Sequence, residues 1–241
     1  MRFVAFSSRN QKEIIRDPLT LLFGIGLPIV IMWLFTIMQG NMPMELYRIE
    51  NLAPGVIVFS FSFLTLFSGM LLGKDKSSSL LMRIFVSPLK SSEYMIGYTI
   101  PLFIIAFIQI IVCFITAFVL DLQFDWNVLV AIIVLLFNAL LYISFGLLLG
   151  TFFTDKQVGG LFAIFVNSSA WLSGTWFSLD MIGGLFEKIA YALPFVHAVD
   201  STRFALKGEY SEILVPSLWV LVYTLIIFII AIIGFKKKMK S

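Results

Sequence analysis

Long apolar runs dominate the chain, and they are separated by short polar connections. Six stretches have about 20 or more mainly apolar residues each, the length that a helix needs to cross a bilayer. None of the six has Asp, Glu, Lys or Arg in its middle. The stretches cover residues 19–38, 53–72, 95–120, 126–152, 158–179 and 213–235. This pattern predicts an all-α membrane protein with six transmembrane helices in a single domain, residues 1–241.

The composition agrees with a location in lipid. Hydrophobic residues make up 60% of the chain and charged residues 13%, whereas soluble domains are usually about 45–50% apolar and about 25% charged. A soluble core of this length cannot bury such an excess, so much of it has to face lipid. The first apolar stretch lacks a small-residue cleavage site at its end, so we expect it to remain as a span rather than to be removed as a signal peptide.

The positions of Lys and Arg predict the orientation. If the N-terminus is cytoplasmic, 13 of the 17 basic residues fall in the N-terminal segment, the 73–94 loop, the 153–157 loop and the C-terminal tail. Nine of the 14 acidic residues then lie on the other side. Cytoplasmic loops carry an excess of Lys and Arg, so we expect both chain ends inside the cell.

Three connections are more than simple turns. Residues 1–18 mix apolar and charged side chains and end at Pro18, which suits the first turn of a helix, so we expect an interfacial helix there. The 73–94 loop has apolar residues at helical spacing among basic ones, which predicts a cytoplasmic helix over 74–88. Residues 180–212 are too polar to span, and we expect short helices on or in the outer leaflet.

Motifs for catalysis are weak. Around Lys74 the sequence departs from a nucleotide-binding P-loop, because Asp75 replaces the hydroxyl residue and Ser68 replaces the first glycine. If ATP drives this protein, another chain has to hydrolyse it. An intramembrane serine protease would need Ser173 to pair with the single histidine, His197, but that histidine lies outside the predicted spans.

The spans contain amides and hydroxyls instead of charges. Ion-coupled carriers usually need ionisable residues at membrane depth, so this alternative has little support. We take Asn138, Asn167 and Ser168 as candidate residues of a substrate path, although such groups more often join helices by hydrogen bonds. Two GxxxG pairs, in 69–73 and 146–150, allow close helix packing either within one subunit or between two.

Four pieces of sequence, in this order and spacing, resemble the permease subunits of type-2 ABC transporters, the class that exports drugs, lipids and polysaccharides. They are Arg16-Asp17-Pro18-Leu19 before a span with Pro28; Leu52-Ala53-Pro54-Gly55; the loop from Lys74 through Leu80, Arg83, Ser87-Pro88 and Glu93 to Gly97; and Leu172-Ser173-Gly174 followed by Ala192-Leu193-Pro194, Asp200 and Arg203. Members often have a Glu-Arg pair and a glycine at the start of the third piece. This chain has Lys74-Asp75-Lys76 there, followed by a run of serines.

The resemblance implies a permease of the bacterial plasma membrane that forms a path for a hydrophobic or amphipathic compound, such as a drug, an antibiotic or a lipid. A cytoplasmic ABC ATPase would bind ATP, and a second permease, identical or paralogous, would lie beside this one. We expect the route to run between the two permeases, lined in part by the second and fifth spans. The chain itself would bind no cofactor, metal or nucleic acid. Residues that would contact the ATPase are Lys74, Lys76, Leu81, Arg83, Ile84 and Phe85.

Two alternatives stay open at this point. The first is an ABC permease that moves ions or gives immunity to a peptide antibiotic, and the second is a membrane enzyme. A neighbouring or co-purifying ATPase would favour the transporter, whereas turnover by the isolated chain would favour the enzyme.

Overall fold

The computed structural model describes residues 2–18, 22–41, 45–77 and 91–238. Within these ranges the chain is helical, with short connections and no strand, which confirms the all-α prediction. Five helical stretches are long and apolar enough to cross a bilayer. They are Leu22–Gly40, Ile49–Ser77, Ser91–Val119, Trp126–Phe152 and Tyr210–Lys238.

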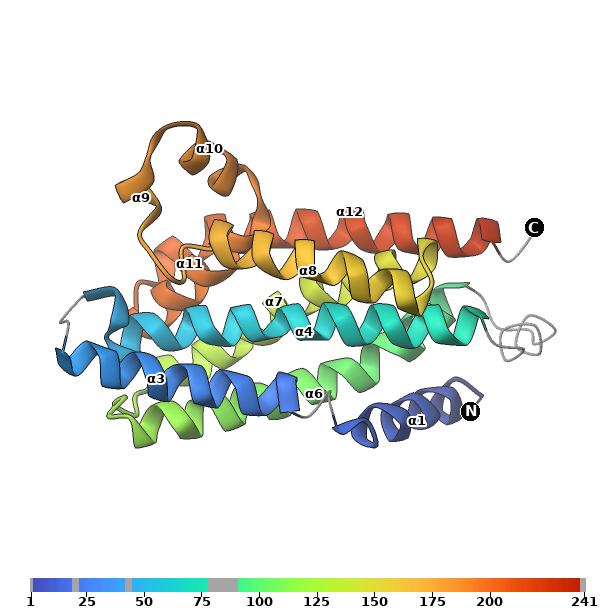
Figure 1. The fold of residues 1–241 in the computed structure, drawn as a ribbon, viewed down its shortest axis with the longest axis horizontal. Coiled ribbons are helices and arrows are strands. Elements are labelled where there is room, and N and C mark those ends of the chain that lie inside the picture. Colours follow the sequence, from blue (N-terminus) through green and yellow to red (C-terminus); the bar gives the residue numbers. More distant parts are fainter. Residues whose placement is uncertain (1, 19–21, 42–44, 78–90, 239–241) are drawn as a thin grey trace.

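Figure 1 labels the main helices of the chain. In chain order the elements are α1 (Arg2–Ile15), η1 (Leu22–Gly26), α3 (Leu27–Asn41), η2 (Glu45–Tyr47), α4 (Ile49–Ser77), α6 (Ser91–Val119), α7 (Trp126–Phe152), α8 (Asp155–Leu172), α9 (Leu179–Ile182), α10 (Gly184–Ala192), α11 (Pro194–Lys207), η3 (Tyr210–Ile213) and α12 (Leu214–Lys238).

The fifth predicted span is shorter than we expected. Helix α8 begins at a capping box formed by Thr154 and Gln157 and ends at Leu172, not at residue 179. A turn follows in which Gly174 has φ +66°, a conformation that glycine adopts without steric cost. Asp155 and Lys156 lie in the first turn of α8. Helix α8 is not among the five helices that are apolar enough to span.

Helix α4 is the central helix of the bundle. In an apolar stretch of 18 residues within α4, 83% of the residues are buried, because α4 packs on α7, α8, α6 and α3. The first and last candidate spans, Leu22–Gly40 and Tyr210–Lys238, lie at the periphery. Only 17% and 28% of the residues in their apolar 18-residue stretches are buried, so their side chains mostly face outward. In Figure 1, α4 runs through the middle of the molecule between α3 and α8.

Three of the four glycines in the two GxxxG pairs lie where α4 meets α7, and the fourth, Gly73, lies against the start of α8. A Cβ atom on Gly150 would lie 2.6 Å from the carbonyl oxygen of Gly69. One on Gly146 would overlap the side chain of Ser68 and the carbonyl of Thr65. The glycines therefore serve packing within one subunit, which decides between the two alternatives that the sequence left open.

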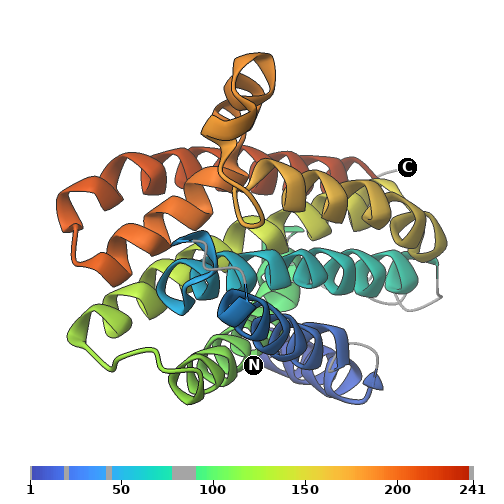
Figure 2. The same ribbon diagram turned by 60° about the vertical axis from the view of Figure 1, so that its left-hand side comes forward.

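The predicted external segment contains three α-helices with different surroundings. Figures 1 and 2 both show α9 and α10 projecting from the side of the bundle, and their apolar side chains Met181 and Leu185 are 77% and 75% exposed. Helix α11 instead lies inside the bundle, packed against α7, α12 and α4. We had expected short helices on or in the outer leaflet; α11 is buried in protein.

One end of the bundle collects the segments that we predicted to be cytoplasmic. The N-terminal helix, the last turns of α4, the α7–α8 connection and the end of α12 all lie at the same end, on the right in Figure 1. Because these segments carry many of the lysines and arginines, we call it the basic end.

Candidate functional site

A cluster of ion pairs joins α1 to the last turns of α4 at the basic end. Arg9 donates to the two carboxylate oxygens of Asp75, at 2.5 and 2.8 Å, and Tyr98 of α6 donates to the same carboxylate at 2.8 Å. Glu13 accepts from Arg9 at 2.6 Å and from Lys74 at 2.7 Å. We call Arg9, Glu13, Lys74 and Asp75 the α1–α4 cluster.

The cluster keeps its charges in place by mutual pairing. Asp75 is only 1% exposed, and a buried carboxylate is costly unless it is paired and hydrogen-bonded. Burial has the largest single effect and lowers the pKa of Arg9, but the hydrogen bond to Asp75 and the negative charges of Asp75 and Glu13 together outweigh it, so the net shift of the pKa is upward. The bidentate geometry fixes α1 relative to α4.

An apolar and a polar contact dock α1 onto α6. Phe6 meets the rings of Tyr94 and Tyr98 edge-on, with centroids 5.6 and 5.0 Å apart. One turn further, the buried Asn10 donates to the carbonyl of Gly97 at 3.3 Å. Residues four apart lie on the same face of a helix, so this face binds α6 while the neighbouring charged face reaches α4.

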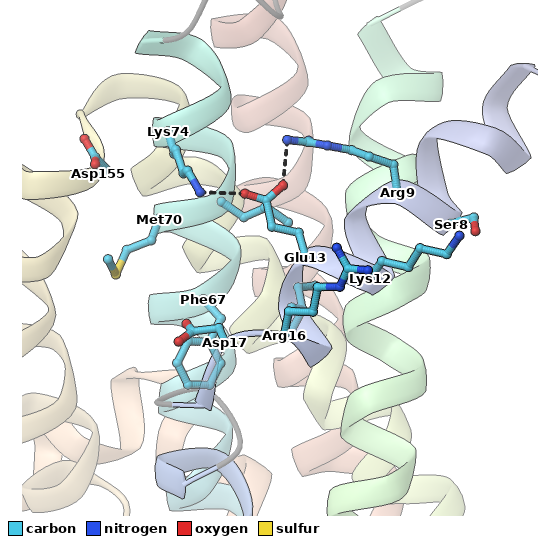
Figure 3. A pocket seen from close by; sticks show the side chains of 12 residues that line it. Ser8, Arg9, Lys12, Glu13, Arg16, Asp17, Phe67, Met70, Lys74 and Asp155 are labelled. Carbon is cyan, nitrogen blue, oxygen red and sulfur yellow. Dashed lines mark hydrogen bonds and ion pairs between the residues drawn. The ribbon is translucent and has the colours of Figure 1, made fainter.

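A pocket of about 950 Å³ opens beside the cluster, between α1, α4 and the start of α8 (Figure 3). Its apolar floor is formed by Phe67, Met70 and Leu71 of α4, and charged side chains form its rim. The lining residues are Ser8, Arg9, Lys12, Glu13, Ile14, Arg16, Asp17, Phe67, Met70, Leu71, Lys74 and Asp155. The combination of an apolar floor and a charged rim suits an amphipathic ligand.

The predicted ATPase-contact residues fall into two groups. Lys74 binds Glu13, and Lys76 donates to the carbonyls of Gly150, Thr151 and Phe153 at 3.1, 3.1 and 2.7 Å. Lys76 thereby satisfies carbonyls at the C-terminal end of α7, where helices lack internal partners. Both lysines are engaged within the chain. The other four predicted residues, Leu81, Arg83, Ile84 and Phe85, lie outside the described residues.

The three predicted path residues are not brought together. Asn138 is fully buried and donates to the carbonyl of Ala198 at 2.8 Å, so it joins α7 to α11. Asn167 is exposed on α8, and its amide donates to Ala163 of the same helix at 2.7 Å. Ser168 beside it is partly exposed. One amide therefore lies in the core and the other faces outward.

Sequence reasoning missed a junction at the opposite end. Arg203 of α11 donates to the carbonyl of Asn51 at 3.2 Å and to that of Gly174 at 3.0 Å. Thr175 donates to the carbonyl of Gly55 at 3.4 Å, and Asp200 lies 3.7 Å from Arg203. The second and fourth pieces of the family resemblance therefore meet in space. The only sign of this junction in the sequence was that both pieces belong to the same resemblance.

The serine protease alternative gains no support from this geometry. His197 bonds the carbonyl of Tyr191 at 2.9 Å and stacks on the ring of Trp219. Ser173 bonds the carbonyl of Ala170 and the hydroxyl of Thr175. A nucleophile needs its base within hydrogen-bond reach, and these two side chains have other partners. The described residues also contain no group of three His, Cys, Asp or Glu that could hold a metal ion.

Comparison with known proteins assigns most of the chain to one family. Residues 43–233 match the family model described as ABC-2 family transporter protein, which confirms the resemblance drawn from the four sequence pieces. The match covers α4 through α11 and most of α12, whereas α1 and α3 precede it. No curated protein matches the chain.

Proposed function

The chain belongs to the ABC-2 family of transporter proteins, and on this premise we propose that it is the permease of an ATP-driven exporter for a hydrophobic or amphipathic compound. The family match over 43–233 carries the proposal. The pocket at the basic end supports it, because an apolar floor under a charged rim suits an amphiphile.

We propose six crossings of the bacterial plasma membrane, with both chain ends in the cytoplasm. Five crossings would leave the two ends on opposite sides, but the N- and C-termini lie at the same end of the bundle in Figure 1. Helix α8 supplies the sixth crossing in this arrangement, because it runs along α4 from the basic end toward the other end.

The ATPase would bind at α1 and at the 74–88 segment. The α1–α4 cluster supports this, because a force on either segment reaches α4, the central helix, through paired charges. The variant Arg83→Glu with Ile84→Pro should abolish co-purification of the ATPase from native membranes. A matched control, Lys207→Glu with Leu206→Pro, alters the opposite end of the molecule. Unchanged co-purification of the ATPase with the first variant would contradict the proposed docking site.

A second permease would pack against the outward face of α8. This face carries Ile164 at 67% and Trp171 at 56% exposure, with Asn167 between them. An amide facing lipid is unfavourable, whereas a neighbouring helix can hydrogen-bond it. Within 59–66 of α4, the stretch proposed to line the path, only the two end residues are not buried.

Cysteine crosslinking tests this arrangement. Cysteines at Ala163 or Asn167, in a Cys113→Ser background, should give a crosslinked dimer in native membranes. Cysteines at Val222 or Ile229, which are also exposed and lie on α12, should give none. A dimer from the α12 positions alone would place the partner on another face.

Reconstitution tests the function itself. Vesicles that contain the permease and its co-purified ATPase should accumulate a fluorescent amphiphile when ATP is added on the ATPase side. They should not accumulate it when the ATPase lacks its catalytic glutamate. Accumulation driven by an ion gradient, or chemical turnover by the isolated chain, would overturn the proposal in favour of a carrier or an enzyme. Movement of an inorganic ion or a peptide antibiotic instead would favour the alternative ABC permease.

A further inference from the structure

A chain of aromatic rings begins in the pocket and follows α4. Phe67 lines the pocket, and Phe63 and Phe59 follow it at every fourth position, with neighbouring ring centroids 6.4 and 6.3 Å apart. Residues four apart lie on the same face of a helix, and each such step advances about 6 Å along its axis. The three rings therefore lead from the basic end toward the opposite end of the bundle.

Rings from other segments continue the chain beyond Phe59. The ring of Trp176, in the turn after α8, lies 5.3 Å from that of Phe59, and the ring of Phe35 on α3 lies 5.2 Å from that of Trp176. Tyr47 of η2 follows, 5.1 Å from Phe35. Each distance falls within the range of about 4.5–7 Å that aromatic pairs prefer. We call the six rings the aromatic track: Phe67, Phe63, Phe59, Trp176, Phe35 and Tyr47.

Two further rings cover the middle of the track. Phe23 of η1 stacks on Phe63 at 5.6 Å, with 12° between the ring planes, and Phe162 of α8 lies 5.4 Å from Phe63. Phe63 is therefore only 7% exposed, but Phe23 is 39% exposed. Exposed side chains change rotamer within nanoseconds. Phe23 can rotate away, and the ring of a ligand can take its place on Phe63.

Four rings of the track keep accessible surface, and they distinguish this face of the molecule from others. The partly exposed rings are those of Tyr47, Phe35, Phe59 and Trp176. On α12, by contrast, the large exposed side chains within 222–233 are all Val, Leu or Ile. An apolar surface that meets lipid needs no aromatic rings, as α12 illustrates. A ring that keeps accessible surface can accept one more aromatic partner.

On the basis of the export function proposed above, we propose that the aromatic track is the route of an amphiphile with a flat aromatic ring system. The pocket volume of about 950 Å³ is at the upper end of the usual range for ligand sites, about 300–1,000 Å³. The head group lies at the charged rim and the ring system at Phe67. The ring system then exchanges one aromatic partner for the next along α4. Several weak sites in a row allow passage, because none of them retains the compound.

Transport of two amphiphiles with the same trimethylammonium head group tests this route. One carries a pyrenylbutyl group and the other a dodecyl chain, and both are offered to vesicles that contain the permease and its co-purified ATPase. Phe59→Leu and Trp176→Leu should each raise the half-saturating concentration of the pyrene compound about two- to tenfold, as expected for the loss of one aromatic pair. Transport of the dodecyl compound should stay unchanged, because leucine keeps the surface apolar.

Matched variants separate the route from general packing. Phe59→Tyr keeps the ring and should transport the pyrene compound like the wild type. Phe118→Leu and Phe124→Leu remove rings of a neighbouring pair outside the track and should leave transport of both compounds unchanged. Cys113 is buried, so its reaction with a maleimide shows whether a variant has unfolded.

Photolabelling of the wild-type chain tests the route without any variant. An azidopyrene form of the first compound should label peptides that contain Phe59, Phe67 or Trp176. Labelling confined to α6 or α12 would overturn the proposal, and so would equal losses of both compounds in Phe59→Leu and Trp176→Leu. These outcomes leave the export function intact. If ATP drives transport of neither compound in the wild type, the proposed function fails, and this inference fails with it.

Discussion

The close contact between α4 and α7 depends on the absence of a side chain at Gly150. A Cβ atom there would lie 2.6 Å from the Gly69 carbonyl oxygen and 2.9 Å from the Cβ of Leu72. Ordinary contacts begin at 3.4 Å, so Gly150→Ala leaves the first contact about 0.8 Å too short. The obstructing atoms are backbone or Cβ atoms, and no rotamer change can move them. The two helices have to separate.

The expected cost is the difference between two effects. Overpacking a tight interface costs about 1–3 kcal/mol, while replacing glycine by alanine inside a helix gains about 0.5–1 kcal/mol. We therefore expect Gly150→Ala to lower the free energy of unfolding by about 1–2 kcal/mol. For a chain of this size each kcal/mol shifts the unfolding midpoint by about 2–4 °C. The midpoint should fall by about 2–8 °C.

The single cysteine provides the assay. Cys113 is fully buried on α6, so a fluorogenic maleimide reacts with it only after the bundle opens on heating in detergent. Gly160→Ala in α8 is the matched control, because nothing lies within 4 Å of a Cβ built there. It should keep or raise the midpoint. If both variants shift the midpoint equally, the inferred α4–α7 contact is wrong.

Three further predictions use the same assay. Arg203→Met should lower stability by about 3–5 kcal/mol, because it leaves Asp200 and the carbonyls of Asn51 and Gly174 without their buried partner; a loss below 1 kcal/mol would contradict the junction. A double-mutant cycle of Arg9→Gln and Asp75→Asn should give a coupling of about 1–2 kcal/mol, reduced from that of a fully buried pair because the Arg9 side chain is 37% exposed to screening water; additive effects would contradict the pair. Burial raises the pKa of Asp200 although Arg203 opposes the shift, so protonation stabilises the folded state below the usual aspartate pKa and this contribution is lost as pH rises through the raised pKa. Asp200→Asn, which mimics the protonated form, should be more stable than the wild type at pH 7 and lose this advantage at lower pH; a constant difference would contradict the shift.

The ends of the helices could not be predicted accurately from the sequence. The apolar run predicted a span over 53–72, but α4 continues to Ser77 because its charged last turns find partners. Arg9 and Tyr98 bind Asp75, and Lys76 binds carbonyls of α7. Helix α8 is shorter than its apolar run. The run continues to residue 179, but the helix ends at Leu172, before a turn in which the carbonyl of Gly174 accepts a hydrogen bond from Arg203 of α11.

The candidate site was even harder to predict from the sequence. The spacing of charges in 1–18 predicted a helix, but not that Lys12 and Arg16 would share a pocket with Asp155, more than 130 residues away in the chain. Asn138 was recognised as an unusual polar residue in a span. Its role in joining α7 to α11 appears only once the helices are packed.

The sequence by itself determined the helical membrane class, the approximate position of most spans and the family. Hydrophobicity belongs to each segment alone, and in lipid an apolar segment has to satisfy its backbone hydrogen bonds internally. Only the tertiary structure decided which charges pair, which glycines touch and where the pocket lies. These features depend on side chains that are far apart in the chain, and their energies arise only when packing removes them from water.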